Sequence, residues 1–249
     1  MKAFGTLFKT ELRLSLRGMD MLIFAICMPV VIMIILGIIY GSKPAFEGAS
    51  YSFLEQSFGA VSAIAICAGG VMGLPLVVSD YRNRKILKRF RVTPVSPTII
   101  LLAQVAVYSI YSITALALVL ATSVLFFGCS FSGSWLSFLG FFLLVMLSMF
   151  SIGMLVGGVS KDTKTANVLC SVLYFPMLIF SGTTLPYEIM PKALQKFSDF
   201  MPLTQGIKLL KASSLGLPLD SALLPIIVMI AISVICIGIS NRFFKWESN

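Results

Sequence analysis

The 249-residue sequence contains no histidine and few charged residues, and both shortages limit what the protein can be. Without histidine, the chain lacks the most common general base and a frequent metal ligand. Charged residues make up 12% of the chain, whereas soluble domains contain roughly 25%. Hydrophobic residues make up 58%. This composition is typical of an integral membrane protein.

Two short motifs are also missing. The five cysteines include no CxxC pair; four lie inside apolar runs and Cys129 lies at the edge of one. A cysteine in such surroundings behaves as a small apolar residue, so we predict no disulfide and no metal site. The chain has no Gly-Lys dipeptide, and a phosphate-binding loop of the P-loop kind requires one. We therefore expect no cofactor in this chain.

Uncharged runs locate the membrane-spanning segments. Four runs of 21 to 24 residues contain no Asp, Glu, Lys or Arg, and one helix needs about 20 residues to cross the bilayer core. A fifth uncharged run, 92–160, is long enough for two crossings and is divided by GCSFSGSW at 128–135. Lipid offers the backbone no hydrogen bonds, so each crossing should be helical. The sequence predicts an all-α integral membrane protein, a single domain over 1–249, with six transmembrane helices at about 21–42, 56–79, 98–127, 136–159, 165–185 and 221–241.

The cations are divided unequally between the two sides of this arrangement. Six crossings put both termini on one side, which carries fourteen of the nineteen Lys and Arg residues, while five acids lie on each side. The positive-inside rule makes the basic side cytoplasmic. We expect a multi-pass protein of the cell inner (plasma) membrane of a prokaryote, with both termini in the cytoplasm. This asymmetry accounts for the net charge of +9 without a nucleic-acid partner.

Two segments outside the spans have helical patterns. In residues 2–17, Phe4, Leu7, Phe8 and Leu12 fall on one side of a helix and the cations on another, which predicts an N-terminal amphipathic helix in the cytoplasmic membrane interface. Residues 185–220 predict two short external helices before the last span, the first starting after Pro191. These helices could cap an exit on the outer face, or they could be a plain connector.

The segment DYRNRKILKRFRVTPVSP, residues 80–97, joins spans two and three on the basic side. Ile86, Leu87 and Phe90 can share one face of a helix that cations surround, and prolines end that helix. Such a helix is suited to docking on another protein. A loop that binds anionic lipid headgroups is the alternative interpretation.

Two motifs show a resemblance to the permease subunit of type-2 ATP-binding cassette (ABC) exporters. LKRFRVTPVSP at 87–97 is similar to that family's loop between spans two and three, and FSGTTLPYEIMPKALQKFSDFMPLTQGIKLLK at 180–211 is similar to its second signature. The amphipathic leader is similar to the family's connecting helix. The chain has RNRK at 82–85 where the family often has an acid and a Gly-Thr.

The resemblance implies a role for the basic segment. It implies a cytoplasmic coupling helix that sits in a groove of a cytosolic ABC ATPase, formed here by Arg84, Lys85, Ile86, Leu87, Lys88, Arg89, Phe90 and Arg91. It also implies two copies of that ATPase, which bind ATP and Mg, and a second permease subunit in a homodimer or a similar heterodimer. This chain is then a transport subunit in membrane lipid, without an ATPase site of its own.

Candidate residues for the transport pathway lie in spans two and five, which the resemblance places beside the substrate route. Those in span two form a stripe of mostly small residues that can serve helix packing as well as a pathway: Ser62, Ile66, Gly69 and Gly73. Those in span five are polar or aromatic: Asn167, Tyr174, Phe175 and Phe180. Span three adds a polar stripe of Gln104, Tyr108 and Tyr111, which should seek protein or water.

The sequence thus favours the permease subunit of an ATP-driven exporter that works by alternating access. No ionisable residue lies in the middle of a predicted span, which fits a drug-like, peptide or lipid-like amphiphile as cargo and disfavours an ion relay. A cell-envelope polysaccharide is the alternative cargo. A secondary transporter or channel that needs no ATPase, and an intramembrane hydrolase, are the alternative classes; the hydrolase would lack a recognisable base.

Overall fold

The computed structural model describes residues 2–18, 23–41, 43–45, 51–87, 97–181, 190–217 and 222–243. Helices account for nearly all of this backbone, as predicted. In chain order they are α1 (Lys2–Arg17), η1 (Ile23–Cys27) with α3 (Met28–Tyr40), α4 (Phe53–Cys67) with η2 (Ala68–Gly73) and α5 (Leu74–Asn83), α7 (Pro97–Phe127), α8 (Trp135–Val159), α9 (Thr163–Phe180), α10 (Lys192–Asp199), α11 (Pro202–Leu215) and α12 (Leu223–Phe243).

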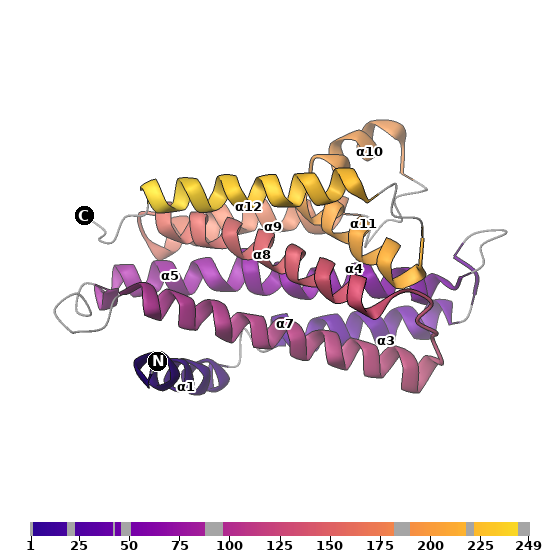
Figure 1. The fold of residues 1–249 in the computed structure, drawn as a ribbon, viewed down its shortest axis with the longest axis horizontal. Helices are drawn as coiled ribbons and strands as arrows, with labels where there is room; N and C mark the ends of the chain where they lie inside the picture. The colour runs from indigo at the N-terminus through magenta and orange to yellow at the C-terminus, as the bar shows by residue number, and fades with distance from the viewer. Residues whose placement is uncertain are drawn as a thin grey trace.

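Six helical segments of the described chain are long and apolar enough to cross a membrane, which is the predicted number. They are Ile23–Tyr40, Phe53–Asn83, Thr98–Phe127, Trp135–Val159, Thr163–Phe180 and Leu223–Ser240. Their axes follow the long axis of the molecule (Figure 1). The end of the bundle that carries α1 and the last residues of α12 is called the α1 end below; α10 and α11 lie at the opposite, α10 end.

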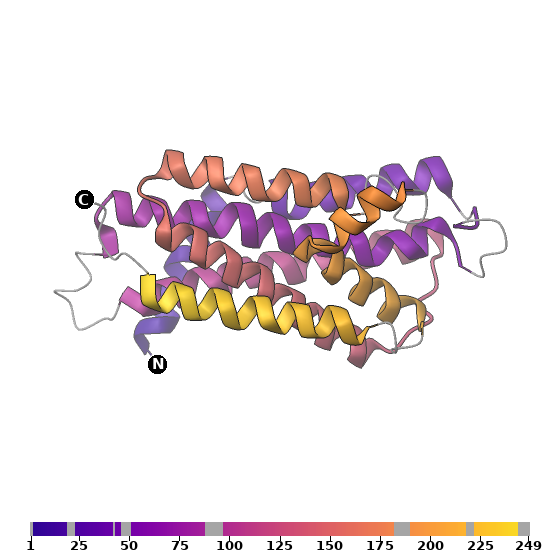
Figure 2. The same cartoon turned by 90° about the horizontal axis from the view of Figure 1, so that it is seen from above.

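The second of these segments, the continuous helix α4–η2–α5, is the centre of the bundle. In its most apolar 18 residues 83% are buried, against 17% for α9 and 22% for α12. The central helix packs against α3, α7, α8, α9 and α11 (Figure 2). A helix that is apolar on every side is expected in this position, because it has no face for water.

Small residues let the neighbouring backbones approach the central helix closely. A Cβ atom on Gly153 of α8 would lie 1.9 Å from the Gly70 carbonyl oxygen, and one on Gly157 would lie 2.9 Å from the Pro75 carbonyl oxygen. A Cβ atom on Gly59 would lie 2.7 Å from the backbone nitrogen of Lys211 in α11. No larger residue fits these positions without a shift of the backbone. The helices are therefore joined mainly through van der Waals contact, as is usual in lipid.

Two of the prolines within the spans follow a π-helical segment. Segment η1 ends two residues before Pro29, and η2 ends two residues before Pro75. Proline has no backbone N–H, so it cannot donate to the carbonyl four residues earlier, and the turn before it widens. The helix nevertheless continues through both sites, which keeps each span in one piece.

The short helices α10 and α11 at the α10 end differ in burial. α10 is mostly exposed, with Phe197 and Phe200 outward. α11 instead packs against α4, α8 and α12, and its Leu203, Leu209 and Leu210 are fully buried. Two short helices before the last span were predicted and are confirmed, whereas the burial of α11 within the bundle was not predicted. The glycine of α4 at position 59 allows α11 to enter the bundle instead of lying on it.

Cysteine labelling tests which end of the bundle faces the cytoplasm. Ser132 is exposed and lies beside Gly216, which ends α11 at the α10 end, and Lys161 is exposed next to Ser160, which Arg82 contacts at the α1 end. In a background without the five native cysteines, an impermeant maleimide on intact cells should label a cysteine at 132 and not one at 161. Permeabilised cells should give both signals. Labelling of position 161 alone on intact cells would reverse the orientation.

Candidate functional site at the α1 end

Three successive residues at the end of the central helix reach three different neighbours. Successive residues in an α-helix point about 100° apart, so Asp80, Tyr81 and Arg82 of α5 face different directions. Asp80 pairs with Arg84, Tyr81 reaches α1, and Arg82 reaches α8. The last turn of α5 thus links the central helix to its surroundings at the point where the basic segment begins.

Arg82 connects α5 to the end of α8. Its Nη1 donates to the carbonyl oxygens of Gly157 at 2.9 Å and Ser160 at 2.6 Å, and the residue is 2% exposed. The last carbonyls of a helix have no partner within the helix and carry the negative end of its dipole, so a guanidinium there is doubly favourable. Arg82 counted as a loop cation in the sequence analysis, but it is a buried residue of the fold.

The turn that Arg82 holds leads directly into α9. Asp162 caps α9 by accepting a 2.7 Å hydrogen bond from the Thr165 backbone N–H, which also lowers the pKa of the Asp162 carboxyl. The lowered pKa means that the cap stabilises α9 above the pKa of the unfolded chain and weakens as acid protonates it. One side chain of α5 and one cap therefore fix the α8–α9 corner.

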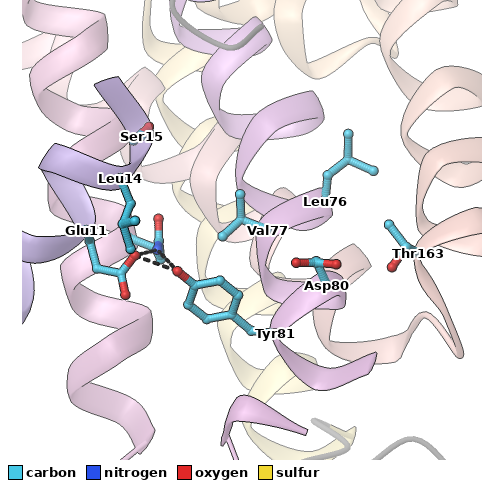
Figure 3. A pocket seen from close by; sticks show the side chains of 9 residues that line it. Glu11, Leu14, Ser15, Leu76, Val77, Asp80, Tyr81 and Thr163 are labelled. Carbon is cyan, nitrogen blue, oxygen red and sulfur yellow. Dashed lines mark hydrogen bonds between the residues drawn. The ribbon is translucent and has the colours of Figure 1, made fainter. Parts of the chain in front are cut away.

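Glu11 of α1 joins α1 to both helices that flank the basic segment. Its Oε2 accepts from the Tyr81 hydroxyl of α5 at 2.5 Å and from Gln104 Nε2 of α7 at 2.7 Å (Figure 3). Gln104 Nε2 also lies 3.2 Å from the Tyr81 hydroxyl oxygen. Glu11 is 8% exposed. Short hydrogen bonds to a buried carboxylate are among the stronger ones in proteins, so this cluster anchors α1.

Most of α1 behaves as its amphipathic pattern predicted. Leu7, Phe8 and Leu12 pack against the apolar core, and the cations of α1 at positions 9, 13 and 17 are exposed. Phe4, which was predicted on the same apolar side, is exposed. The Tyr111 hydroxyl of α7 donates to Ser15 Oγ at 2.7 Å. The polar stripe of span three, Gln104 with Tyr111, therefore faces protein, as expected for polar groups in a spanning helix.

A cavity of about 350 Å³ lies between α1, α5, α7 and α9. Leu14, Leu76 and Val77 give it apolar walls, and Glu11, Ser15, Asp80, Tyr81, Gln104 and Thr163 supply polar groups. Figure 3 shows Tyr81 extending toward Glu11, with Asp80 on the side nearer Thr163. The described lining contains two carboxylates and no Lys or Arg. This cavity is the candidate functional site.

The predicted coupling helix, 84–91, is described only over its first half. α5 ends at Asn83, and Arg84 and Lys85 form a turn in which Lys85 has a φ of 58°, so they are not the first helical residues that we predicted. A left-handed residue stops an α-helix, which explains the break. Helical backbone returns at Ile86 and Leu87. Lys88, Arg89, Phe90 and Arg91 lie outside the described residues.

Leu87 needs a further correction. The sequence analysis grouped it with Ile86 and Phe90 as apolar residues that face a partner, but Leu87 is 1% exposed and belongs to the apolar core of this chain. Ile86 is partly buried. The docking role of the segment stays a prediction, and within its described part Leu87 serves the fold.

The candidate pathway residues of span two are packed inside the chain. Ser62 and Ile66 are fully buried, Gly69 and Gly73 are buried as well, and the Ser62 hydroxyl donates to the Phe58 carbonyl oxygen at 2.8 Å. A Cβ atom on Gly69 would touch the Tyr108 ring at 3.5 Å. Their burial favours the packing interpretation for the stripe.

The candidates of span five lie on α9, which is largely uncovered in this chain. Asn167 and Phe175 are exposed, whereas Tyr174 and Phe180 are partly buried. The Tyr174 and Phe175 rings lie 5.7 Å apart, and the Phe180 ring lies 5.2 Å from the Phe197 ring of α10. Because α9 packs against η2 of span two, the pathway role of these four residues stays a prediction.

Sequence reasoning missed Glu11, Tyr81 and Arg82 as functional candidates. Glu11 and Arg82 were considered there only as charges in the comparison of the two sides of the membrane. One available signal was the position of Glu11 in α1, between Phe8 and Leu12 on the apolar side of the helix. A lone acid on that side needs donors, and the polar stripe of span three had no assigned partners.

Comparisons with known proteins agree with the resemblance. The profile of the family described as ABC-2 type transporter matches residues 2–215. The chain is 23% identical over 184 residues, 73% of its length, to the Probable multidrug ABC transporter permease YbhS of Escherichia coli (strain K12). It is 30% identical over 97 residues, 39% of its length, to Nodulation protein J of Rhizobium leguminosarum bv. viciae. The matches cover 48% and 35% of those relatives, so the chain spans about half or less of the curated relatives it matches.

Replacing Arg82 tests whether it holds the α8–α9 corner. Arg82→Met keeps the volume and removes both hydrogen bonds from a charged donor, so we expect the free energy of unfolding to fall by about 2–4 kcal/mol. The matched control is Arg84→Met, because the Arg84 side chain is 70% exposed and its pair with Asp80 should be worth about 1 kcal/mol or less. Thermal unfolding of both purified variants in detergent gives the comparison. Equal stability of the two would refute the role of Arg82.

Proposed function

The chain belongs to the ABC-2 type transporter family, and from this premise we propose that it is the permease subunit of an ATP-driven ABC exporter. The match of the family over residues 2–215 is the observation that carries the proposal. The six apolar helices supply a membrane domain of suitable size. A separate subunit supplies the energy, because the sequence has no Gly-Lys dipeptide for a phosphate-binding loop.

The position of the basic segment supports a mechanical role for it. The segment follows α5, the last part of the helix that packs against α3, α7, α8, α9 and α11. We expect force applied at residues 84–91 to reach these five neighbouring helices through the turn at Arg84 and Lys85 and the central helix. We propose that the cytosolic ATPase binds this segment and that ATP-driven closure of the ATPases rearranges the helices between inward-open and outward-open states.

The proposed assembly contains two permease subunits and two ATPase subunits, with ATP and Mg bound on the ATPases. The second permease is identical or similar to this chain. The α1 end, which carries both the described start of the chain and the basic segment, faces the cytoplasm of a prokaryotic cell, and α10 lies on the outer side of the inner membrane. The excess of Lys and Arg at the α1 end supports this orientation.

The proposed cargo is a drug-like, peptide or lipid-like amphiphile. The cavity at the α1 end has both apolar walls and polar groups, which suits such a molecule better than a polysaccharide. The name of one relative, a probable multidrug permease, agrees with this choice. Dependence on an ATPase separates the proposal from a secondary transporter or channel.

Because a separate subunit is proposed to bind and hydrolyse ATP, the purified chain should hydrolyse none. Nucleotide binding and phosphate release should stay at background for the chain alone and should appear when its cognate ATPase subunit is added. The proposal would be contradicted if the chain, purified free of the ATPase subunit, still hydrolysed ATP and an alanine substitution in the chain itself abolished that activity.

Docking of residues 84–91 predicts that Phe90 matters more than any one cation of the segment. Burial of a phenylalanine in a groove is worth roughly 1.5–3 kcal/mol, whereas an exposed ion pair is worth about 0–1 kcal/mol. Phe90→Ala should therefore weaken capture of the ATPase in a pull-down at low and at raised salt, and Lys88→Ala should change it little.

Leu87→Ala separates docking from folding in the same experiment. Leu87 is buried in this chain, so its truncation should lower the thermal stability of the permease itself. Full retention of the ATPase by Phe90→Ala at both salt concentrations would contradict docking and favour the lipid-headgroup interpretation of the segment.

A further inference from the structure

We propose that the cavity between α1, α5, α7 and α9 binds an amphiphilic organic cation, and that Glu11 recognises its positive charge. The cavity would receive cargo from the inner leaflet, so its part in transport rests on the proposed function, whereas binding itself does not. Three observations carry the proposal: the state of the Glu11 carboxylate, the lining of the cavity and the exposed position of its rim.

Glu11 is a buried carboxylate that lacks a cation among the described residues. Both of its hydrogen bonds come from neutral groups, the Tyr81 hydroxyl and the Gln104 amide, and both reach the same oxygen, Oε2. Oε1 accepts no hydrogen bond from the part of the chain that the structure describes. A charged group that is 8% exposed is costly unless an opposite charge compensates it. A cation in the cavity supplies that charge.

The lining selects the rest of the ligand. Leu14, Leu76 and Val77 present apolar surface, so the bound molecule needs an apolar body beside its charged group. Asp80 gives the cavity a second carboxylate, although Arg84 already pairs with it at 2.9 Å. A volume of about 350 Å³ suits a small organic molecule and not a polymer segment with its shell of water.

The rim of the cavity is open to the surroundings of the bundle. Leu14 lines the cavity and is 52% exposed, and α1, which carries it, packs on the side of the bundle against α7 (Figure 1). An amphipathic helix of this kind lies at the level of the lipid headgroups. An amphiphilic cation concentrates at the same level, with its charge toward the anionic surface. The ligand and the opening of the cavity therefore lie at the same depth, that of the lipid headgroups.

Tetraphenylphosphonium and tetraphenylborate test the charge requirement, because the two ions have nearly the same shape and opposite charge. Binding of each is measured on the purified full-length chain in phosphatidylglycerol nanodiscs, after subtraction of empty discs. We expect saturable binding of tetraphenylphosphonium and none of tetraphenylborate. Binding of both ions with similar affinity would overturn the proposal.

Glu11→Gln tests the assignment of the charge to Glu11. The amide keeps the size of the side chain and an oxygen that accepts from Tyr81, so the helix contacts survive while the charge is lost. The loss of the Coulombic attraction between this carboxylate and the cation should weaken tetraphenylphosphonium binding about tenfold. The matched control is Asp199→Asn, which removes the same charge at the α10 end, where Asp199 pairs with Lys208 at 2.6 Å. The control should bind as the wild type does.

Two outcomes decide against the site. Equal affinity of wild type and Glu11→Gln would mean that the charge of Glu11 does not face the ligand. A similar loss on Asp199→Asn would mean that the ion follows the total charge of the protein. Thermal stability of Glu11→Gln is measured on the same discs. If it is unchanged, a loss of binding cannot be attributed to unfolding of the variant. Capture of the ATPase through residues 84–91 is independent of this result, so the two proposals fail separately.

The same discs identify the source of the cation. Addition of phosphatidylethanolamine offers the cavity a lipid ammonium group. Competition by this lipid against tetraphenylphosphonium, absent in Glu11→Gln, would assign the site to a lipid headgroup. Unchanged binding would assign it to a cation that is not a membrane lipid. Both results uphold recognition of an amphiphilic cation by Glu11.

Discussion

Close backbone packing around one central helix is the constraint on which the rest of this structure depends. Lipid is as apolar as leucine, so helices in a membrane gain little from the hydrophobic effect and associate through van der Waals contact. Glycines at positions 70, 153 and 157 bring α8 against the central helix, and Gly59 admits α11. Because these contacts are between backbones, they leave little freedom for one helix to move without its neighbours.

Because the spans are tightly packed along their length, the polar side chains that link different helices lie at the end of the central helix. Its last turn carries Asp80, Tyr81 and Arg82: Asp80 pairs with Arg84 just beyond the helix, Tyr81 reaches α1 and Arg82 reaches α8. Arg82 acts on the α8–α9 corner and Tyr81 acts on α1. In the proposed function, a displacement of the basic segment that follows would be passed through this one helical turn both into the bundle and to α1.

The sequence predicted the elements of the fold far better than the details of the site. Uncharged runs are set by the thickness of the bilayer, so six spans followed from length and composition, and the amphipathic pattern of α1 placed Leu7, Phe8 and Leu12 inward. Charge counting could not tell that Arg82 is buried or that Glu11 meets Tyr81 and Gln104, because those partners are 70 to 93 residues away. The burial of Leu87 and of α11 was not predicted for the same reason: it depends on neighbours that no local pattern reveals.

The two buried charges at the α1 end are compensated in different ways, and this difference gives each its role. The positive charge of Arg82 lies on the last carbonyls of α8, where the helix dipole stabilises it, so it is a permanent part of the packing. The negative charge of Glu11 meets only neutral donors within the described chain, on one of its two oxygens. Because Glu11 keeps an uncompensated charge beside apolar walls, this end of the bundle retains an affinity for a cation that the fold itself does not supply.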